Sequence, residues 1–186
     1  MTQTKTDPRV IRTRSLIMDS FIQLSGKKDF KDITVKDLTA EAMINRATFY
    51  YHFEDIYDLL EKALSEVLLV NLDYEHFRDS RLDEEALVRI FTAVTNFQLS
   101  LSNRCHSGYE DTIARIIRNQ LEVIFSKMLS GQDPEADDQS LQITAAMLSW
   151  EIYGASVEWR RNSGVDPGDF IRPALSSVLN GIRVVR

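Results

Sequence analysis

Residues 34–53 hold two short apolar segments in close succession, and each begins after a side chain that can cap a helix. Thr34 precedes the first segment, with Asp37 three residues later, and Asn45 precedes the second. Such side chains accept hydrogen bonds from the free N–H groups of a first helical turn. Two helices joined by so few residues pack roughly crosswise, and a further helix must cover their apolar sides. The stretch therefore predicts a helix-turn-helix.

The covering helix is predicted to begin near Arg9, because Asp7 can cap it and Pro8 is tolerated in a first turn. Gly26 marks its expected end. Its apolar stripe is formed by Ile17, Phe21 and Leu24. Residues 1–55 are thus predicted to form a three-helix domain.

The second helix of the motif carries more hydrogen-bonding groups than its packing requires, because Phe49 and Phe53 suffice as inward anchors. In a helix-turn-helix this second helix enters the major groove of DNA, where its first side chains meet base edges. Arg46 can make paired bonds to guanine, and Thr48 can bond a base edge or touch a thymine methyl group. We expect both to read bases, with the small Ala47 allowing close approach of the backbone.

Tyr50, Tyr51 and His52 carry polar tips on rigid rings, which suits bonds to phosphate that fix register without reading sequence. Lys36 and the caps of the preceding helix predict another phosphate site. The structural alternative is that aromatic residues at helical spacing belong to the core and that a lone His is an ordinary surface residue. No second His or Cys stands at metal-ligand spacing from His52, so no metal site is expected.

The sequence contains, in order, a threonine-capped helix, a short recognition helix and a final Tyr-x-His-Phe motif. The residues that mark this pattern are Thr34, Tyr50, His52 and Phe53. Between Leu16 and Leu60 this pattern resembles the TetR family of bacterial one-component transcriptional regulators. The resemblance also covers Ile17, Phe21, Phe30, Ala42, Arg46, Phe49 and Leu59. It implies that DNA is contacted by Thr34, Lys36, Arg46, Ala47, Thr48, Tyr50, Tyr51 and His52. It further implies an all-helical homodimer on a palindromic operator, more often a repressor than an activator, that answers to an effector.

Two positions depart from the family pattern. Met43 stands in the turn where the family often has Gly, and Ile56 stands where it often has Lys. Loss of that Lys removes an expected phosphate contact, so DNA affinity or its salt dependence is predicted to differ from the family norm.

Residues 56–186 are predicted to form a second, larger helical domain, which makes the fold all-α. Its helices are expected at about 56–77, 83–103, 107–130, 138–162 and 167–183, and no alternation typical of strands persists anywhere. Pro173 falls inside the last of them, where a Pro costs about 3 kcal/mol. A kink or a late helix start is therefore predicted there.

The last two helices carry faces that a monomer would bury poorly, which predicts a two-fold, four-helix dimer interface. The predicted interface residues are Leu148, Ile152, Ala155, Trp159, Phe170, Ala174, Ser177, Val178 and Gly181. The alternative is that these faces pack on the middle helices of the same chain. A small-molecule pocket is predicted between the middle helices, with Cys105 and His106 near its mouth. Its predicted lining is Phe91, Phe97, Tyr109, Ile113, Ile117, Met147 and Trp150, each of which also fits an ordinary core position.

The net charge of −6 is unusual for a DNA-binding protein, so its distribution matters more than its sum. Residues 1–36 contain eight basic and four acidic side chains, whereas residues 61–186 contain 13 basic and 19 acidic ones. A local basic footprint is what a phosphate backbone requires. The acidic remainder is predicted to face away from DNA.

Several classes of protein are disfavoured. Cys105 is the only cysteine, so no intrachain disulfide is possible, and no apolar run approaches the roughly 20 residues of a membrane span. A cytoplasmic location is expected. The sequence shows no glycine-rich phosphate loop, nucleophile elbow or paired-His motif, so neither catalysis nor a cofactor is expected. Two alternatives stay open: a helical protein-interaction module that has lost DNA binding, and an activator controlled by a protein partner.

Overall fold

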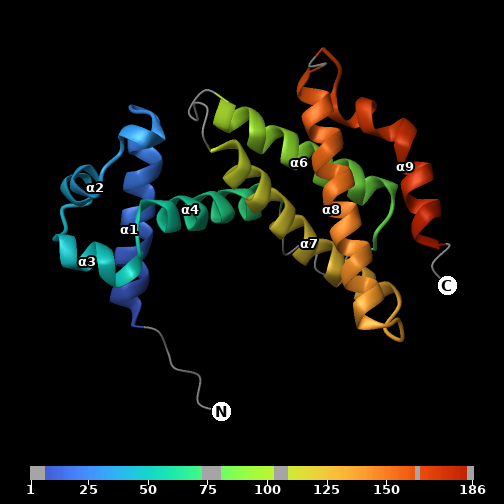
Figure 1. The fold of residues 1–186 in the computed structure, drawn as a ribbon, viewed down its shortest axis with the longest axis horizontal. Helices are drawn as coiled ribbons and strands as arrows, with labels where there is room; N and C mark the ends of the chain where they lie inside the picture. The colour runs from blue at the N-terminus through green and yellow to red at the C-terminus, as the bar shows by residue number, and fades with distance from the viewer. Residues whose placement is uncertain (1–6, 73–80, 103–108, 162–163, 184–186) are drawn as a thin grey trace. The chain divides into compact units, whose positions relative to one another are not determined.

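A computed structural model of the chain describes residues 7–72, 81–102, 109–161 and 164–183, which contain helices and no strand (Figure 1). The all-α prediction is confirmed. The N-terminal helices are α1 (Pro8–Ser25), the 3₁₀ helix η1 (Phe30–Asp32), α2 (Val35–Glu41), α3 (Arg46–His52) and α4 (Ile56–Asn71). The later helices are α6 (Glu84–Ser102), α7 (Glu110–Gln132), α8 (Asp138–Arg161) and α9 (Pro167–Arg183).

The chain divides into two compact units. The smaller unit comprises Met1–Leu64 and Ser102–Tyr109, and the larger unit comprises Ser65–Leu101 and Glu110–Arg186. Helix α4 contributes residues to both units, because the division falls within it. The boundary predicted at residue 55 divides the chain by function, with DNA binding before it and ligand binding and dimerisation after it. That boundary stays a prediction.

Helix α1 begins as its sequence predicts. The carboxylate of Asp7 accepts a hydrogen bond of 2.9 Å from the backbone N–H of Arg9, and Pro8 occupies the first turn. Gly26 caps the C-terminal end. The predicted apolar stripe is buried, and it comprises Ile17, Phe21 and Leu24. The helix-turn-helix therefore packs against the apolar face of this helix.

Helices α2 and α3 are each held by the predicted cap. Thr34 and Asp37 form a complete capping box at the start of α2, and Asn45 accepts a hydrogen bond from the backbone N–H of Thr48 at the start of α3. Leu38 of α2 and Phe49 of α3 are fully buried. Both predicted caps and the predicted anchor Phe49 are confirmed.

The turn between α2 and α3 contains a strained residue. Met43 has a φ of 50°, a left-handed conformation that costs a residue with a Cβ atom free energy. Its side chain is 90% exposed, so no packing offsets that cost. The departure from Gly at this position thus has a physical consequence in the folded chain.

The helices of the larger unit begin within three residues of the predicted starts. Aspartates at the boundaries fix three of these starts. The carboxylates of Asp83, Asp137 and Asp166 accept hydrogen bonds of 2.8–2.9 Å from backbone N–H groups of α6, α8 and α9. Pro173 lies inside α9, so the predicted late start is wrong, and the ribbon of α9 changes direction along its length (Figure 1).

The predicted dimer face of α8 is already buried within one chain. Leu148, Ile152 and Trp159 belong to the core of the larger unit, and the indole N–H of Trp159 donates to the carbonyl of Val165 at 2.8 Å. Buried side chains have no exposed area to offer a second copy, so these three positions need correction. The alternative of packing within the chain holds for them.

The predicted residues of α9 divide between the core and the surface. Phe170 is half-buried and stacks on Phe91 at 6.1 Å. Ala174, Ser177 and Gly181 are exposed. Ala155 of α8 and Val178 of α9 are half-buried.

Candidate nucleic-acid interface

Helix α3 presents a polar surface around a small apolar anchor. Phe49 and the capping residue Phe53 are buried, with ring centroids 5.8 Å apart. Tyr51 is 72% exposed, and Tyr50 is also exposed. Arg46 and Ala47 are exposed as well, whereas Thr48 and His52 are half-buried. The fixed anchor therefore holds a set of unburied polar groups that packing does not require.

Arg46 and Tyr50 form a pair on the surface of α3. A terminal guanidinium nitrogen of Arg46 donates to the hydroxyl of Tyr50 at 3.2 Å. The same guanidinium lies over the Tyr50 ring, 5.6 Å from its centroid, and the ring stands edge-on to Phe49 at 5.3 Å. Tyr50 thus links the exposed arginine to the buried anchor. Such restraint lowers the side-chain entropy that Arg46 would lose on forming a bidentate contact.

Thr48 takes part in the cap of α3. Its backbone N–H and its hydroxyl both donate to the side-chain oxygen of Asn45, at 2.7 and 2.9 Å. The hydroxyl hydrogen is therefore engaged, and the groups left for DNA are the oxygen lone pairs and the methyl group. The thymine-methyl contact considered from sequence suits this geometry better than donation to a base.

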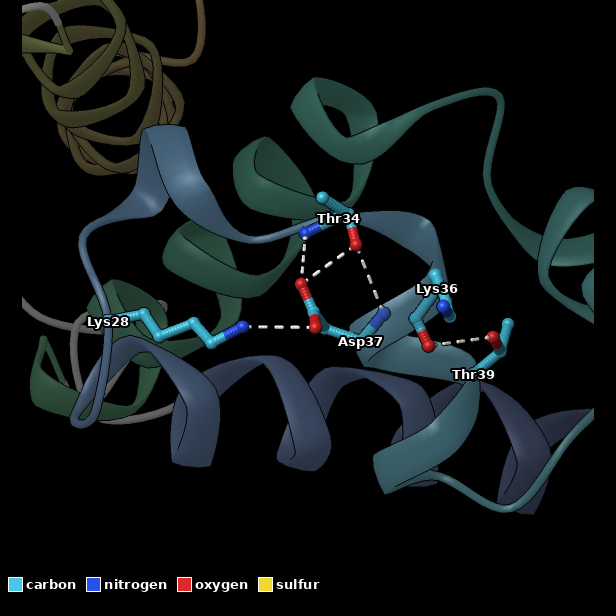
Figure 2. A network of polar contacts seen from close by, with 5 residues as sticks. All are labelled: Lys28, Thr34, Lys36, Asp37 and Thr39. Atoms are coloured by element: carbon cyan, nitrogen blue, oxygen red, sulfur yellow. Dashed lines mark hydrogen bonds and ion pairs between the residues drawn. The ribbon is translucent and has the colours of Figure 1, made fainter.

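The start of α2 is closed by a polar network (Figure 2). The Asp37 carboxylate accepts from the backbone N–H of Thr34 at 2.9 Å and from its hydroxyl at 2.8 Å, while the Lys28 ammonium lies 3.0 Å away. The backbone N–H of Asp37 in turn donates to the Thr34 hydroxyl oxygen at 3.2 Å. Hydrogen bonds from Lys28 and Thr34 lower the pKa of Asp37 from 3.8 to about 2, so the carboxylate is ionised at neutral pH.

This network changes the interpretation of the predicted phosphate site. The capping N–H groups of Thr34 and Asp37 are already paired, so they are not available to a phosphate. The side chain of Lys36 is exposed. The backbone carbonyl of Lys36 accepts a hydrogen bond of 3.1 Å from the hydroxyl of Thr39 (Figure 2). Lys36 is consequently the group at this helix end that best suits a phosphate contact.

His52 closes α3 beside a cation. Burial, followed by the nearby Arg14 guanidinium, lowers the pKa of His52 below its usual range, so the imidazole is neutral at pH 7. A neutral ring offers phosphate a hydrogen bond without a charge. Arg14 belongs to α1, and its guanidinium carbon lies 5.8 Å from the centroid of the Phe53 ring. Its proximity to His52 could not be inferred from residue spacing.

The residues predicted to line an effector pocket do not lie around a single cavity. Phe91, Phe97 and Ile117 are fully buried, and Ile113 is half-buried. Tyr109 belongs to the smaller unit, where its ring meets Phe30 and Tyr57. Met147 and Trp150 are 59% and 57% exposed, because they lie on the side of α8 opposite its buried residues. Cys105 and His106 lie outside the described residues.

Within the described ranges, no group of three or more His, Cys, Asp or Glu side chains is placed to hold a metal ion. None of the described helices combines the length and apolar character needed to cross a membrane.

Comparison with known sequences identifies the smaller unit. The sequence model of a family described as "Bacterial regulatory proteins, tetR family" matches residues 17–63. The chain is also similar to YxbF of Bacillus subtilis (strain 168), an uncharacterized HTH-type transcriptional regulator, with 30% identity over 100 residues. That alignment includes 50% of this chain and 26% of YxbF, so the chain matches about a quarter of its relative's length.

Solved structures share the fold. The TetR family repressor AlkX from Dietzia sp. strain DQ12-45-1b aligns with a TM-score of 0.58 and 15% identity, over 91% of this chain and 97% of AlkX. The dihydroxyacetone kinase operon activator DhaS aligns with a TM-score of 0.55 and 16% identity, over 94% of this chain and 98% of DhaS. Residues 17–63 therefore match the TetR family of bacterial regulatory proteins, and the solved structures show that the chain shares their helical fold.

Proposed function

We propose that the chain binds a palindromic DNA operator as a homodimer, acts there as a repressor in the cytoplasm, and is released or modulated by an effector. In this proposal residues 1–55 bind DNA, and residues 56–186 carry dimerisation and the response to the effector. The observation that carries the proposal is helix α3. It exposes Arg46 and Tyr51 on a helix whose start is capped and whose anchor is buried.

The charges around α2 and α3 support the same proposal. Lys36 and Arg46 are exposed on the two helices of the motif, and the basic excess of the chain lies within its first 36 residues. We assign base reading to Arg46 and to the methyl group of Thr48, and phosphate contacts to Lys36, Tyr51 and His52. Thr34 and Ala47 shape the surface: Thr34 fixes the start of α2, and Ala47 leaves room for DNA to approach.

For dimerisation we propose a surface formed by exposed small residues of α9. Ala174, Ser177 and Gly181 follow one another at helical spacing and are all exposed, so another helix can approach α9 closely along them. These three positions belong to the interface predicted from sequence, and the buried positions of that prediction are left out.

A matched pair of variants tests this dimer surface. Ser177→Arg places a charge on the proposed surface, whereas Ser176→Arg places the same charge on another exposed side of α9. Sedimentation should show that only Ser177→Arg shifts the protein to monomer at micromolar concentration. Equal behaviour of the two variants would contradict the assignment.

DNA binding is tested by fluorescence anisotropy with a labelled fragment from beside the protein's own gene, at two salt concentrations. A regulator should lose affinity steeply with salt, because each neutralised phosphate contributes about −0.9 to the slope of log K against log salt. Lys36→Ala should reduce that slope by about one. Lys127→Ala, which removes a lysine of the larger unit, is the control and should leave the slope unchanged.

The same titration separates the proposal from its competitor. A helical interaction module that does not bind DNA would show no saturation with any promoter fragment, even at low ionic strength. The sign of regulation is tested separately with a reporter gene placed behind the bound fragment. Reporter output should rise when the gene for the protein is deleted, and a fall would identify an activator.

A further inference from the structure

The larger unit has a surface groove between α7 and α8, which pack along one another. Its volume is ≈ 450 Å³, within the range of about 300–1,000 Å³ typical of small-molecule sites. The lining residues are Asp111, Thr112, Ala114, Arg115, Arg118, Trp150 and Tyr153. Of the residues predicted from sequence to line a pocket, only Trp150 is among them.

An arginine and a tryptophan form one wall of the groove. The guanidinium carbon of Arg118 lies 3.8 Å from the centroid of the Trp150 ring, which is close stacking. The Nε–H group of Arg118 donates to the carbonyl of Ala114 at 3.3 Å. Among the residues that the structure describes, the terminal guanidinium nitrogens have no hydrogen-bond or ion-pair partner. The hydrogen bond to Ala114 and the stacking on Trp150 therefore hold Arg118 in place, and its terminal N–H groups can still donate to a ligand.

Two hydroxyl groups add polar contacts to the groove. Tyr153 and Thr112 are half-buried in the lining, and the Tyr153 hydroxyl makes no hydrogen bond to any residue in the described ranges. Burial raises the pKa of Tyr153 above its usual range, although Arg118 and Arg160 oppose that shift. The phenol is consequently a neutral donor at physiological pH.

The balance of charges limits which ligands fit. Arg115 and Arg118 contribute two positive charges to the lining and Asp111 one negative charge, which favours a monoanion over a phosphate dianion. A planar guanidinium matches the two oxygens of a carboxylate, and the exposed face of the Trp150 ring provides a flat apolar surface. We infer that the α7–α8 groove binds a small planar molecule that carries a single carboxylate.

Binding at this groove is independent of DNA. A regulatory role for the site rests on the function proposed above, because only a DNA-binding protein can be released by such a ligand. The binding itself is measured on the protein alone. Failure of the carboxylate to bind therefore leaves the DNA proposal intact, and failure to bind DNA leaves this inference intact.

The experiment titrates the full-length protein with 2-naphthoate and, separately, with its neutral isostere 2-naphthamide. The chain has two tryptophans, so two indole N–H signals report binding by nuclear magnetic resonance, and a Trp150→Phe variant assigns them. Naphthoate should shift the Trp150 signal saturably and leave the buried Trp159 signal nearly fixed. It should bind roughly tenfold or more tightly than the amide, since hydrogen bonds to charged groups contribute that much.

Two arginine variants locate the charge that the ligand meets. Arg118→Gln should weaken naphthoate binding roughly tenfold and leave naphthamide binding unchanged. Arg172→Gln is the matched control: it removes an arginine that pairs with Glu84 and Glu85 elsewhere in the larger unit, and it should change neither affinity. An unchanged Trp159 signal verifies that each variant is folded.

Several results would overturn the inference. They are the absence of saturable naphthoate binding, equal affinity for the acid and the amide, and an undiminished naphthoate affinity in Arg118→Gln. A Trp150 signal that moves with protein concentration instead of ligand would show that a second copy covers the groove, which also refutes it. Because the comparison of acid with amide uses the unmodified protein, the test does not depend on any variant folding.

Discussion

The candidate DNA-binding surface and the larger unit of this chain use contacts of different reach along the sequence. On the candidate DNA-binding surface, which we define as Lys36, Arg46, Tyr50 and Tyr51, the paired side chains Arg46 and Tyr50 lie four residues apart. In the larger unit Gln98 donates to Ser156 across 58 residues, and Arg172 reaches Glu85 across 87. Local contacts can be predicted from spacing, whereas distant ones depend on how helices pack.

Both units contain an arginine that lies over an aromatic ring, and this shared feature sharpens the contrast. Arg46 lies 5.6 Å from the Tyr50 centroid within one helix, and Arg118 lies 3.8 Å from the Trp150 centroid across two helices. The first pair follows from i, i+4 geometry alone. The second requires α7 and α8 to pack in one particular register. The Arg46–Tyr50 contact can therefore be inferred from sequence spacing, whereas the Arg118–Trp150 contact cannot.

The largest effect is expected when the local pair is broken at its arginine. Arg46→Ala should remove roughly 1–3 kcal/mol of discrimination between the operator and a scrambled fragment, because a bidentate base contact is lost. Tyr51→Phe should weaken both fragments about equally, since it removes only a phosphate bond. Competition titrations measure both ratios. An equal loss on the two fragments for Arg46→Ala would refute its base-reading role.

A second effect concerns the local cap of α2. Thr34→Ala should destabilise the smaller unit by about 1 kcal/mol, because the first-turn N–H of Asp37 loses its partner. Thr39→Ala is a matched control on the same helix, since the Thr39 hydroxyl bonds the Lys36 carbonyl and caps nothing. Thermal unfolding compares the two variants. If both lower stability by the same amount, the capping contact is not what stabilises this end of α2.

A smaller effect is expected at the turn between α2 and α3. A left-handed residue with a Cβ atom costs roughly 1–2 kcal/mol of folding free energy. Gly removes this cost, but it also loses more backbone entropy on folding, so the net gain in stability is smaller. Met43→Gly should therefore stabilise the protein by roughly 0.5–1 kcal/mol. Met147→Gly, at an exposed helical position of the larger unit, should destabilise it by about 1 kcal/mol. Chemical denaturation should show these opposite signs.

The success of prediction from sequence follows the same division. The caps by Asp7, Thr34 and Asn45 and the anchors Phe49 and Phe53 were predictable, because each depends on residues within a few positions. The helix boundaries of the larger unit were predictable for the same reason, since polar turns separate apolar runs.

Which face of α8 is buried could not be predicted in this way. Both of its sides carry large apolar residues, with Ile152 and Trp159 on the buried side and Met147 and Trp150 on the exposed side. Periodicity reveals a stripe without showing which neighbour covers it. The sequence therefore predicted a dimer face where the structure has core, and it placed Met147 in a pocket where the structure leaves it exposed.

The smallest effect is expected from acid, at the carboxylate of Asp37. Its pKa is about 2 in the folded protein and near 3.8 when unperturbed, so the ionised form favours folding above pH 3.8. That contribution is lost as the pH falls from 3.8 towards 2, because the folded state then takes up the proton. The effect is modest because the carboxylate lies at the surface, where water screens its partner Lys28. In Asp37→Asn this part of the acid dependence should disappear, while Asp32→Asn, outside the network, should retain it. Thermal melts between pH 4 and pH 2 provide the comparison, and parallel curves for the two variants would show that the Lys28–Asp37–Thr34 network does not stabilise α2.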